Sequence, residues 1–129
     1  MGRSTSGKSI LVVEDNFLTA RLLEATLESC GYSVVVARSG DEVLDVAREH
    51  QPSLILLNMN LSRPSGSEVL RSLGPRRGGV PVISMTVLGQ AEVQASASRL
   101  GVRHFLELPF DPKVLVHQVQ SILENGTVP

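Results

Sequence analysis

Short apolar runs alternate along the chain with segments in which apolar positions recur at helical spacing. The runs occupy residues 9–13, 33–37, 54–57, 81–85 and 104–106. The strings ILVV and LILL, in the first and third runs, are continuously apolar, which is typical of central parallel strands covered by helices on both faces. The pattern therefore predicts repeated strand–helix units around a buried, mostly parallel sheet.

Capping residues predict where the intervening helices begin. Asn16 is a good N-cap for the first helix, and Gly31 would end that helix. Its apolar spacing places four residues on a common face: Leu18, Leu22, Ala25 and Ser29. Other start signals are two Ser–Glu capping boxes and one Asp–Pro pair: Ser39 with Glu42, Ser65 with Glu68, and Asp111 with Pro112. The last helix has Leu115, Val119 and Ile122 at helical spacing and a stop at Asn125-Gly126.

Five such units predict an α/β fold, a flavodoxin-like doubly wound sheet of five parallel strands with five helices. Right-handed crossovers and short connections favour the strand order 2-1-3-4-5. We expect one domain over residues 8–125, between flexible tails at 1–7 and 126–129. In open sheets of this kind the working site lies beyond the carboxyl ends of the strands.

Composition narrows the class of protein. The chain has 129 residues, 42% of them hydrophobic and 19% charged, with a net charge of -1, which describes an ordinary globular domain. Arg76 and Arg77 are too few to predict nucleic-acid binding, and no apolar run approaches the roughly 20 residues of a membrane span. The single cysteine, Cys30, cannot form an internal disulfide. We therefore expect a cytoplasmic protein with neither nucleic-acid nor membrane partners.

The segment GRSTSGKS at residues 2–9 satisfies the phosphate-loop pattern in its letters alone. That motif works because a strand delivers the loop and a helix follows it, so that backbone N–H groups face the phosphates. Here no strand is predicted before the loop, and a strand follows it. We therefore do not interpret this segment as a nucleotide site.

Polar residues follow several of the predicted strands. Glu14 and Asp15 come after the first, Asn58 and Asn60 after the third, and Thr86 after the fourth. Two adjacent carboxylates at a strand end could hold a hard cation such as Mg²⁺. The alternative is that Asp15 and Asn16 only cap the first helix.

Ordered motifs across the chain resemble a known family. The strings ILVVEDN, SLILLNMNLSRPSGSEVL, PVISMT and HFLELPFDP are similar to successive motifs of response regulator receiver domains, the CheY-like family, over about residues 8–124. The resemblance implies a two-component or phosphorelay role. It also implies Mg²⁺ binding by Glu14, Asp15 and the backbone carbonyl of Asn60, with Thr86 and Phe105 as switch residues.

The chain departs from that family at two positions of the phosphorylation chemistry. Asn58 stands where the resemblance implies the acceptor aspartate, and Leu108 stands where it implies a lysine. A carboxamide is a poor nucleophile, and a leucine cannot donate a hydrogen bond to a phosphoryl oxygen. We therefore expect a phosphorylation-incompetent pseudo-receiver, which is no enzyme and has no cofactor, or at most weak Mg²⁺ binding.

Two alternatives remain open at this point. A phosphoaccepting, Mg²⁺-dependent receiver with an inactivating Asp-to-Asn substitution would explain Asn58, but neither Leu108 nor Val87, where the family usually has a smaller residue. The pocket could also bind a different small ligand. Without a cation, we expect Glu14 or Asp15 to have a raised pKa or to hydrogen-bond to Asn58 or Thr86.

The resemblance also implies how the chain would signal. The usual output surface combines the fourth helix, fifth strand and fifth helix, here residues 90–100, 104–108 and 111–124. Its exposed candidates for contacts are Arg99, Arg103, His104 and His117. A receiver that has no output domain of its own must act through another protein, so we expect a histidine kinase, a phosphotransfer protein or an output protein as partner.

Overall fold

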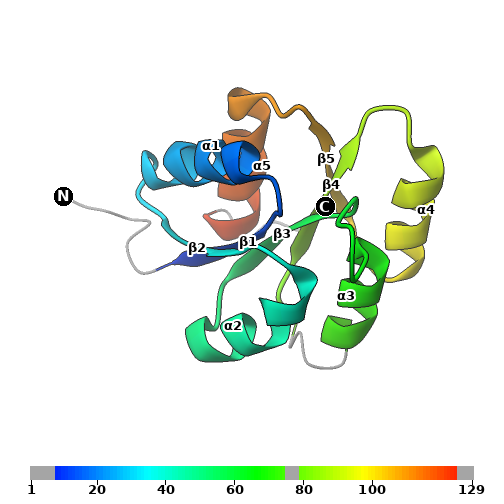
Figure 1. Ribbon diagram of the computed structural model, residues 1–129. Helices are drawn as coiled ribbons and strands as arrows, with labels where there is room; N and C mark the ends of the chain where they lie inside the picture. The colour runs from blue at the N-terminus through cyan, green and yellow to red at the C-terminus, as the bar shows by residue number, and fades with distance from the viewer. Residues whose placement is uncertain (1–7, 75–78, 125–129) are drawn as a thin grey trace.

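The structure is a computed structural model that describes residues 8–74 and 79–124 (Figure 1). The expected tails at 1–7 and 126–129, the Asn125-Gly126 helix stop, and Arg76 with Arg77 lie outside the described residues.

Five parallel strands form one sheet in the order β2-β1-β3-β4-β5. The strands are β1 (Ser9–Val13), β2 (Ser33–Ala37), β3 (Leu54–Asn58), β4 (Val82–Val87) and β5 (His104–Leu108). The predicted fold class and strand order are confirmed. The third, fourth and fifth strands extend beyond the apolar runs that predicted them, to Asn58, Val87 and Leu108, and the fourth begins one residue later, at Val82.

Helices cover both faces of the sheet. They are α1 (Phe17–Glu28), α2 (Val43–His50), α3 (Gly66–Leu73), α4 (Ala91–Arg99) and α5 (Pro112–Leu123). Figure 1 shows α1 and α5 together on one face, and α2, α3 and α4 on the other. No helix within residues 8–74 and 79–124 has the length and apolar character needed to cross a membrane.

The core consists of two apolar clusters, one on each face of the sheet. Leu11, Val13, Ile55 and Leu57 point into the cluster beneath α2, α3 and α4. The alternate residues of the same strands point into the cluster beneath α1 and α5: Ile10, Val12, Leu54 and Leu56. Because side chains alternate along a strand, the continuous apolar runs fill both clusters at once.

Three of the predicted caps are present. The side chain of Asn16 accepts from the backbone N–H of Thr19, and that of Asp111 accepts from Lys113. Ser65 and Glu68 form both halves of a capping box. The other predicted box, Ser39 with Glu42, is wrong: Ser39 makes no capping hydrogen bond, because a 3-10 helix (Gly40–Glu42) precedes α2.

The face predicted for the first helix is not its core face. Leu18 is 65% exposed and Leu22 is 52% exposed, whereas Ala20, Leu23 and Leu27 are buried. Both sets recur at helical spacing, because α1 carries apolar residues on two sides. Periodicity alone could not decide which of them faces the sheet.

Candidate functional site

The parallel strands end at one edge of the sheet, where the polar residues predicted from the sequence gather. Glu14 directly follows β1, Asn58 ends β3, Thr86 is the second-last residue of β4, and Leu108 ends β5. Backbone hydrogen bonds continue beyond the strands, from Glu14 N–H to the carbonyl of Ala37 at 3.1 Å. These bonds hold the first residues after the strands in fixed positions.

Glu14 is a buried acid with an unusual environment. Its side chain is 1% exposed, and its Oε2 accepts from Asn58 Nδ2 at 2.9 Å and from the backbone N–H of Asn16 at 3.1 Å. Its Oε1 is buried and has no hydrogen-bond partner among the described residues. Burial, reinforced by the nearby charge of Asp15, raises the pKa of Glu14 above its usual value.

The expectation about the acidic pair is confirmed for Glu14, which has both a raised pKa and a hydrogen bond to Asn58. Asp15 lies on the surface. The two adjacent acids therefore differ in environment, and of the two only Glu14 is buried at this edge of the sheet. The alternative interpretation is confirmed for Asn16, which caps the first helix, while the capping hydrogen bond of that helix does not involve the side chain of Asp15.

The carboxamide of Asn58 is held at both ends. Its Nδ2 donates to Glu14, and its Oδ1 accepts from the backbone N–H of Asn60 at 2.7 Å. A backbone N–H can only donate, so this second bond fixes which end of the amide faces Glu14. The side chain is 6% exposed, and its donor lies against the acid.

The side chain of Asn60 connects two loops. Its Nδ2 donates to Gln90 Oε1 at 2.7 Å, and its Oδ1 accepts from the backbone N–H of Val87 at 3.4 Å. Sequence reasoning considered only the backbone carbonyl of Asn60 and missed Gln90. Glutamine is not among the preferred helix caps, so the sequence carried no signal for this contact.

Two hydroxyl groups on β4 are buried. Thr86 is 1% exposed and Ser84 is 0% exposed, and neither hydroxyl oxygen has a partner within residues 8–74 and 79–124. Both point to the same side of the strand because they are two residues apart. Phe105 is the cross-strand neighbour of Ser84 and packs, half-buried, against the cluster beneath α2, α3 and α4. The strand period relative to Thr86 could have indicated Ser84 from the sequence.

Apolar residues occupy the remaining positions of the site. Leu108 is half-buried and packs against the cluster beneath α1 and α5. Val87 is 46% exposed, and Leu88 beside it is 69% exposed. Neither position offers a donor side chain to an anion at this edge.

The donor set does not fit a tightly held Mg²⁺. One oxygen of Glu14 already accepts two N–H donors, and Asn58 turns its donor, not its oxygen, toward that acid. No group of three or more His, Cys, Asp or Glu side chains that could hold a metal occurs in the described parts of the chain. Mg²⁺ prefers several anionic oxygens before it gives up water. The amide of Asn58 thus takes the place beside Glu14 that a cation would need.

Comparison with known proteins finds similarity to response regulators. A family model described as the response regulator receiver domain matches residues 10–120. The chain is 33% identical over 121 residues to the polar-differentiation response regulator DivK of Brucella ovis, covering 92% of this chain and 98% of that protein. It is also 33% identical over 124 residues to the probable transcriptional regulator ycf27 of Cyanophora paradoxa, of which it spans 52%.

Solved structures share the fold. The receiver domain of NtrX from Brucella abortus superposes with a TM-score of 0.82 at 28% identity, covering 89% of this chain and 98% of that one. A CheY-like receiver domain protein from Methanospirillum hungatei superposes with a TM-score of 0.85 at 24% identity, covering 92% of this chain and 94% of that one.

Proposed function

From the premise that this chain belongs to the response regulator receiver domain family, we propose that it is a pseudo-receiver. It takes part in two-component or phosphorelay signalling by binding another protein and accepts no phosphoryl group. Since the chain spans about half the length of the first curated relatives it matches, this proposal concerns the receiver domain itself.

The observation that carries this proposal is the position of Asn58. Its carboxamide lies where the family resemblance implies the acceptor aspartate, and both of its ends are engaged, with Glu14 and with the backbone N–H of Asn60. An amide nitrogen has no lone pair free for attack on phosphorus, because it is delocalised into the carbonyl. The amide oxygen is neutral and a weak nucleophile compared with a carboxylate.

The surroundings of Asn58 support the same function. Leu108 packs into the core instead of offering a cation, and Val87 is larger than the residue usual in the family. The unpartnered hydroxyl of Thr86 is retained, but the groups that would bring a phosphoryl group to it are absent from the described site. The site therefore works without bound Mg²⁺ and as a structural, non-catalytic element.

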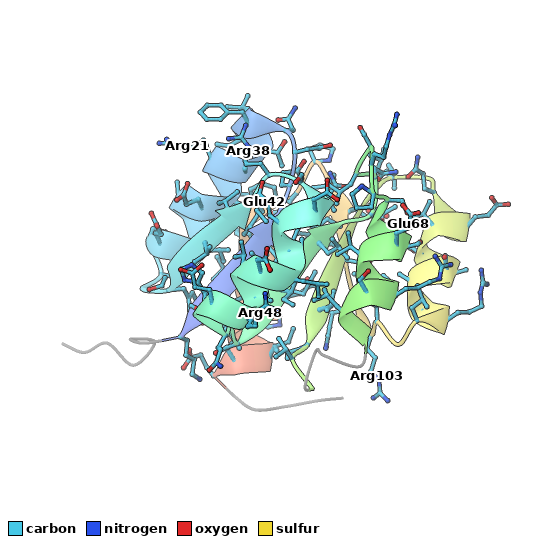
Figure 2. The ribbon with its side chains drawn as sticks, turned by 60° about the horizontal axis from the view of Figure 1, so that its bottom comes forward. Arg21, Arg38, Glu42, Arg48, Glu68 and Arg103 are labelled. Carbon is cyan, nitrogen blue, oxygen red and sulfur yellow. The ribbon has the colours of Figure 1, made fainter. Side chains whose placement is uncertain are left out.

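Receiver domains interact with histidine kinases, phosphotransfer proteins or output proteins. We place the partner on the face formed by α4, β5 and α5, and the domain in the cytoplasm. Figure 2 shows Arg103, which precedes β5, extending away from the body of the molecule, as a residue open to a partner would.

Intact mass spectrometry tests the loss of phosphorylation. The unmodified chain is incubated with acetyl phosphate and Mg²⁺, beside Asn58→Asp and the double variant Asn58→Asp with Leu108→Lys. We expect no added phosphoryl mass on the unmodified chain. A stable phosphoryl adduct on it would overturn the proposal.

The same experiment separates the alternative in which a working receiver carries one inactivating substitution. Efficient phosphorylation of Asn58→Asp alone favours that alternative. If Asn58→Asp is inert and the double variant is modified, both lost positions matter, as the pseudo-receiver proposal requires.

A capture experiment tests the partner face. The chain is used as bait in an extract of its native cell. The affinity of the captured protein is then measured for Arg103→Glu and for the control Arg48→Glu, a charge reversal on α2, which lies toward the β2 edge of the sheet and away from β5. We expect weaker binding with Arg103→Glu and unchanged binding with Arg48→Glu. Equal effects of both variants would contradict the assignment of the face.

A further inference from the structure

A chain of side-chain hydrogen bonds crosses the carboxyl edge of the sheet. It runs from Glu14 to Asn58 at 2.9 Å, from Asn58 to the backbone N–H of Asn60 at 2.7 Å, and from the Asn60 side chain to Gln90 at 2.7 Å. It thus connects the end of β1, through the end of β3, to the residue that precedes α4. These three links involve four residues from three separate segments of the chain.

Gln90 is the N-cap residue of α4, yet its side chain makes no capping hydrogen bond. Its backbone carbonyl accepts from Val93 at 3.1 Å and from Gln94 at 3.2 Å, so the first turn of the helix depends on where Gln90 lies. The side chain points instead to Asn60. The hydrogen bond between them therefore holds the start of α4 against the end of β3.

The other contacts of α4 are mostly apolar. Ala97, near the end of α4, is buried, while Val93 in its first turn and Leu100 just after its end are partly buried against the core. Between the helices, Ser96 Oγ lies 3.3 Å from Ser67 Oγ of α3. Ala97, Leu100 and Ser96 thus hold the middle and end of α4, whereas Val93 gives its first turn an apolar contact. The hydrogen bond between Asn60 and Gln90 adds a side-chain polar link at the beginning of the helix.

Asn60 also restrains the loop that leads to α4. Its Oδ1 accepts from the backbone N–H of Val87, so one side chain binds both ends of residues 87–90. Val87 and Leu88, both exposed, are the apolar residues of this loop. A loop held at both ends loses less conformational freedom when a partner binds it.

We propose that Asn60 and Gln90 are positioning residues that hold the loop 87–90 and the first turn of α4 in one conformation, ready for a partner. We refer to these two residues as the Asn60–Gln90 clasp. This inference rests on the proposed function, since it explains how a receiver surface keeps a defined shape without a phosphoryl group. The clasp is itself built on Asn58, whose Oδ1 orients the backbone of Asn60.

Amide hydrogen exchange of the whole chain, followed by NMR, tests the clasp. The reporting amides are those of Val87, Val93 and Gln94, and the reference amides are those of Ala20 and Leu115 in the first turns of α1 and α5. In Asn60→Ala and in Gln90→Ala, we expect the reporting amides to exchange about two- to tenfold faster, the effect of losing one hydrogen bond. The reference amides should keep their rates.

Two further variants separate positioning from a general loosening of α4. Gln90→Glu keeps an oxygen that accepts from Asn60 Nδ2, so slow exchange should be retained. Ser96→Ala removes the contact to α3 but leaves the clasp intact, and exchange at Val87 should not change. Unaltered exchange at all three reporting amides in both alanine variants would overturn the clasp, and so would a Ser96→Ala effect equal to theirs.

The outcome is independent of the phosphorylation test. A phosphoryl adduct on the unmodified chain would contradict the pseudo-receiver function but would not change exchange rates measured without a phosphodonor. Conversely, a failed clasp would leave the intact mass result as it stands. With the captured partner, Asn60→Ala and Gln90→Ala should each weaken binding, and Gln90→Glu should bind as the unmodified chain does.

Discussion

Asn58 donates its side-chain amide to the carboxylate of Glu14 across 2.9 Å and so joins the end of β3 to the end of β1. Both side chains are buried, at 6% and 1% exposure. A buried acid is costly unless a donor or a cation compensates it, and here the compensation comes from amide and backbone N–H groups. The site is consequently organised around one acid and a neutral amide.

The buried acid predicts a pH dependence of stability. The pKa of Glu14 is raised above its ordinary value of 4.5, so the folded state binds this proton more tightly than the unfolded state does. The contribution of Glu14 to the free energy of unfolding is therefore greatest below pH 4.5 and falls as pH rises from there through the raised pKa. Glu14→Gln should remove this fall, because glutamine still accepts from Asn58 and has no proton to lose.

Urea unfolding over a series from about pH 4 to about pH 8 measures this effect, as the difference between the unmodified chain and Glu14→Gln. We expect Glu14→Gln to gain in relative stability as pH rises. Glu92→Gln, an exposed change on α4, is the control and should follow the unmodified chain. Parallel curves for Glu14→Gln and the unmodified chain would show that the acid is not perturbed.

The strands and most helix starts could be predicted from the sequence because they depend on local patterns. Continuous apolar runs are typical of buried parallel strands, and Asn16, Ser65 and Asp111 are capping residues whose hydrogen bonds span two or three positions. The register of Glu14, Asn58 and Thr86 at one edge then followed from the parallel topology.

The core face of α1, the contact between Asn60 and Gln90 and the start of α2 depend on tertiary contacts that no local sequence pattern encodes. Leu18 and Leu22 have the same spacing as a core face, and only packing against the sheet shows that they are exposed. Asn60 and Gln90 meet across 30 positions of sequence, and neither residue type has a strong preference for the contact. Ser39 and Glu42 match the capping-box spacing, but the chain forms a 3-10 turn there instead.

Gly66 packs closely against the backbone of the segment that carries Asn58, so we expect any larger residue at this position to displace that segment. A Cβ added at Gly66 would lie 2.5 Å from Met59 Cα and 3.0 Å from the carbonyl oxygen of Asn58, so the backbone after β3 would have to move. We expect Gly66→Ala to destabilise the fold by about 1–3 kcal/mol, the usual range for overpacking. It should also shift the NMR signals of the Asn58 side-chain amide.

Gly74→Ala is the matched control for Gly66→Ala. Gly74 follows the same helix, has a right-handed backbone conformation, and an added Cβ there would meet nothing within 4 Å. It should be neutral or stabilise by about 0.5–1 kcal/mol, because alanine restricts the unfolded chain. Chemical denaturation of both variants measures the contrast, and equal effects would show that the close approach at Gly66 is relieved without cost.

The backbone conformation of Gln51 suggests that a glycine at this position would stabilise the fold. It ends α2 in the left-handed conformation, with φ of 47°, and its backbone N–H bonds to the carbonyl of Ala47 at 2.8 Å. A side chain costs roughly 1–2 kcal/mol in that conformation, whereas glycine adopts it readily. Gln51→Gly should therefore raise the free energy of unfolding by about 0.5–1 kcal/mol, since glycine also gains freedom in the unfolded state. Gln51→Ala keeps the Cβ and should give no such gain, so thermal unfolding of the pair isolates the backbone effect.

We expect coupling between two substitutions that introduce the residues implied by the family resemblance, Asp at position 58 and Lys at position 108. Asn58→Asp alone replaces a donor beside Glu14 with a second carboxylate, so it should destabilise the fold at neutral pH, and Mg²⁺ should reverse part of the loss. Leu108→Lys alone gives up apolar packing against the cluster beneath α1 and α5, at a cost of about 1–2 kcal/mol.

In the double variant the ammonium group can compensate the added carboxylate, as the family resemblance implies for these two positions. A double-mutant cycle by urea denaturation, with and without Mg²⁺, should therefore show a favourable coupling of about 0.5–3 kcal/mol. Strict additivity of the two substitutions would contradict this expectation, because it would mean that the ammonium group at position 108 does not interact with the carboxylate at position 58.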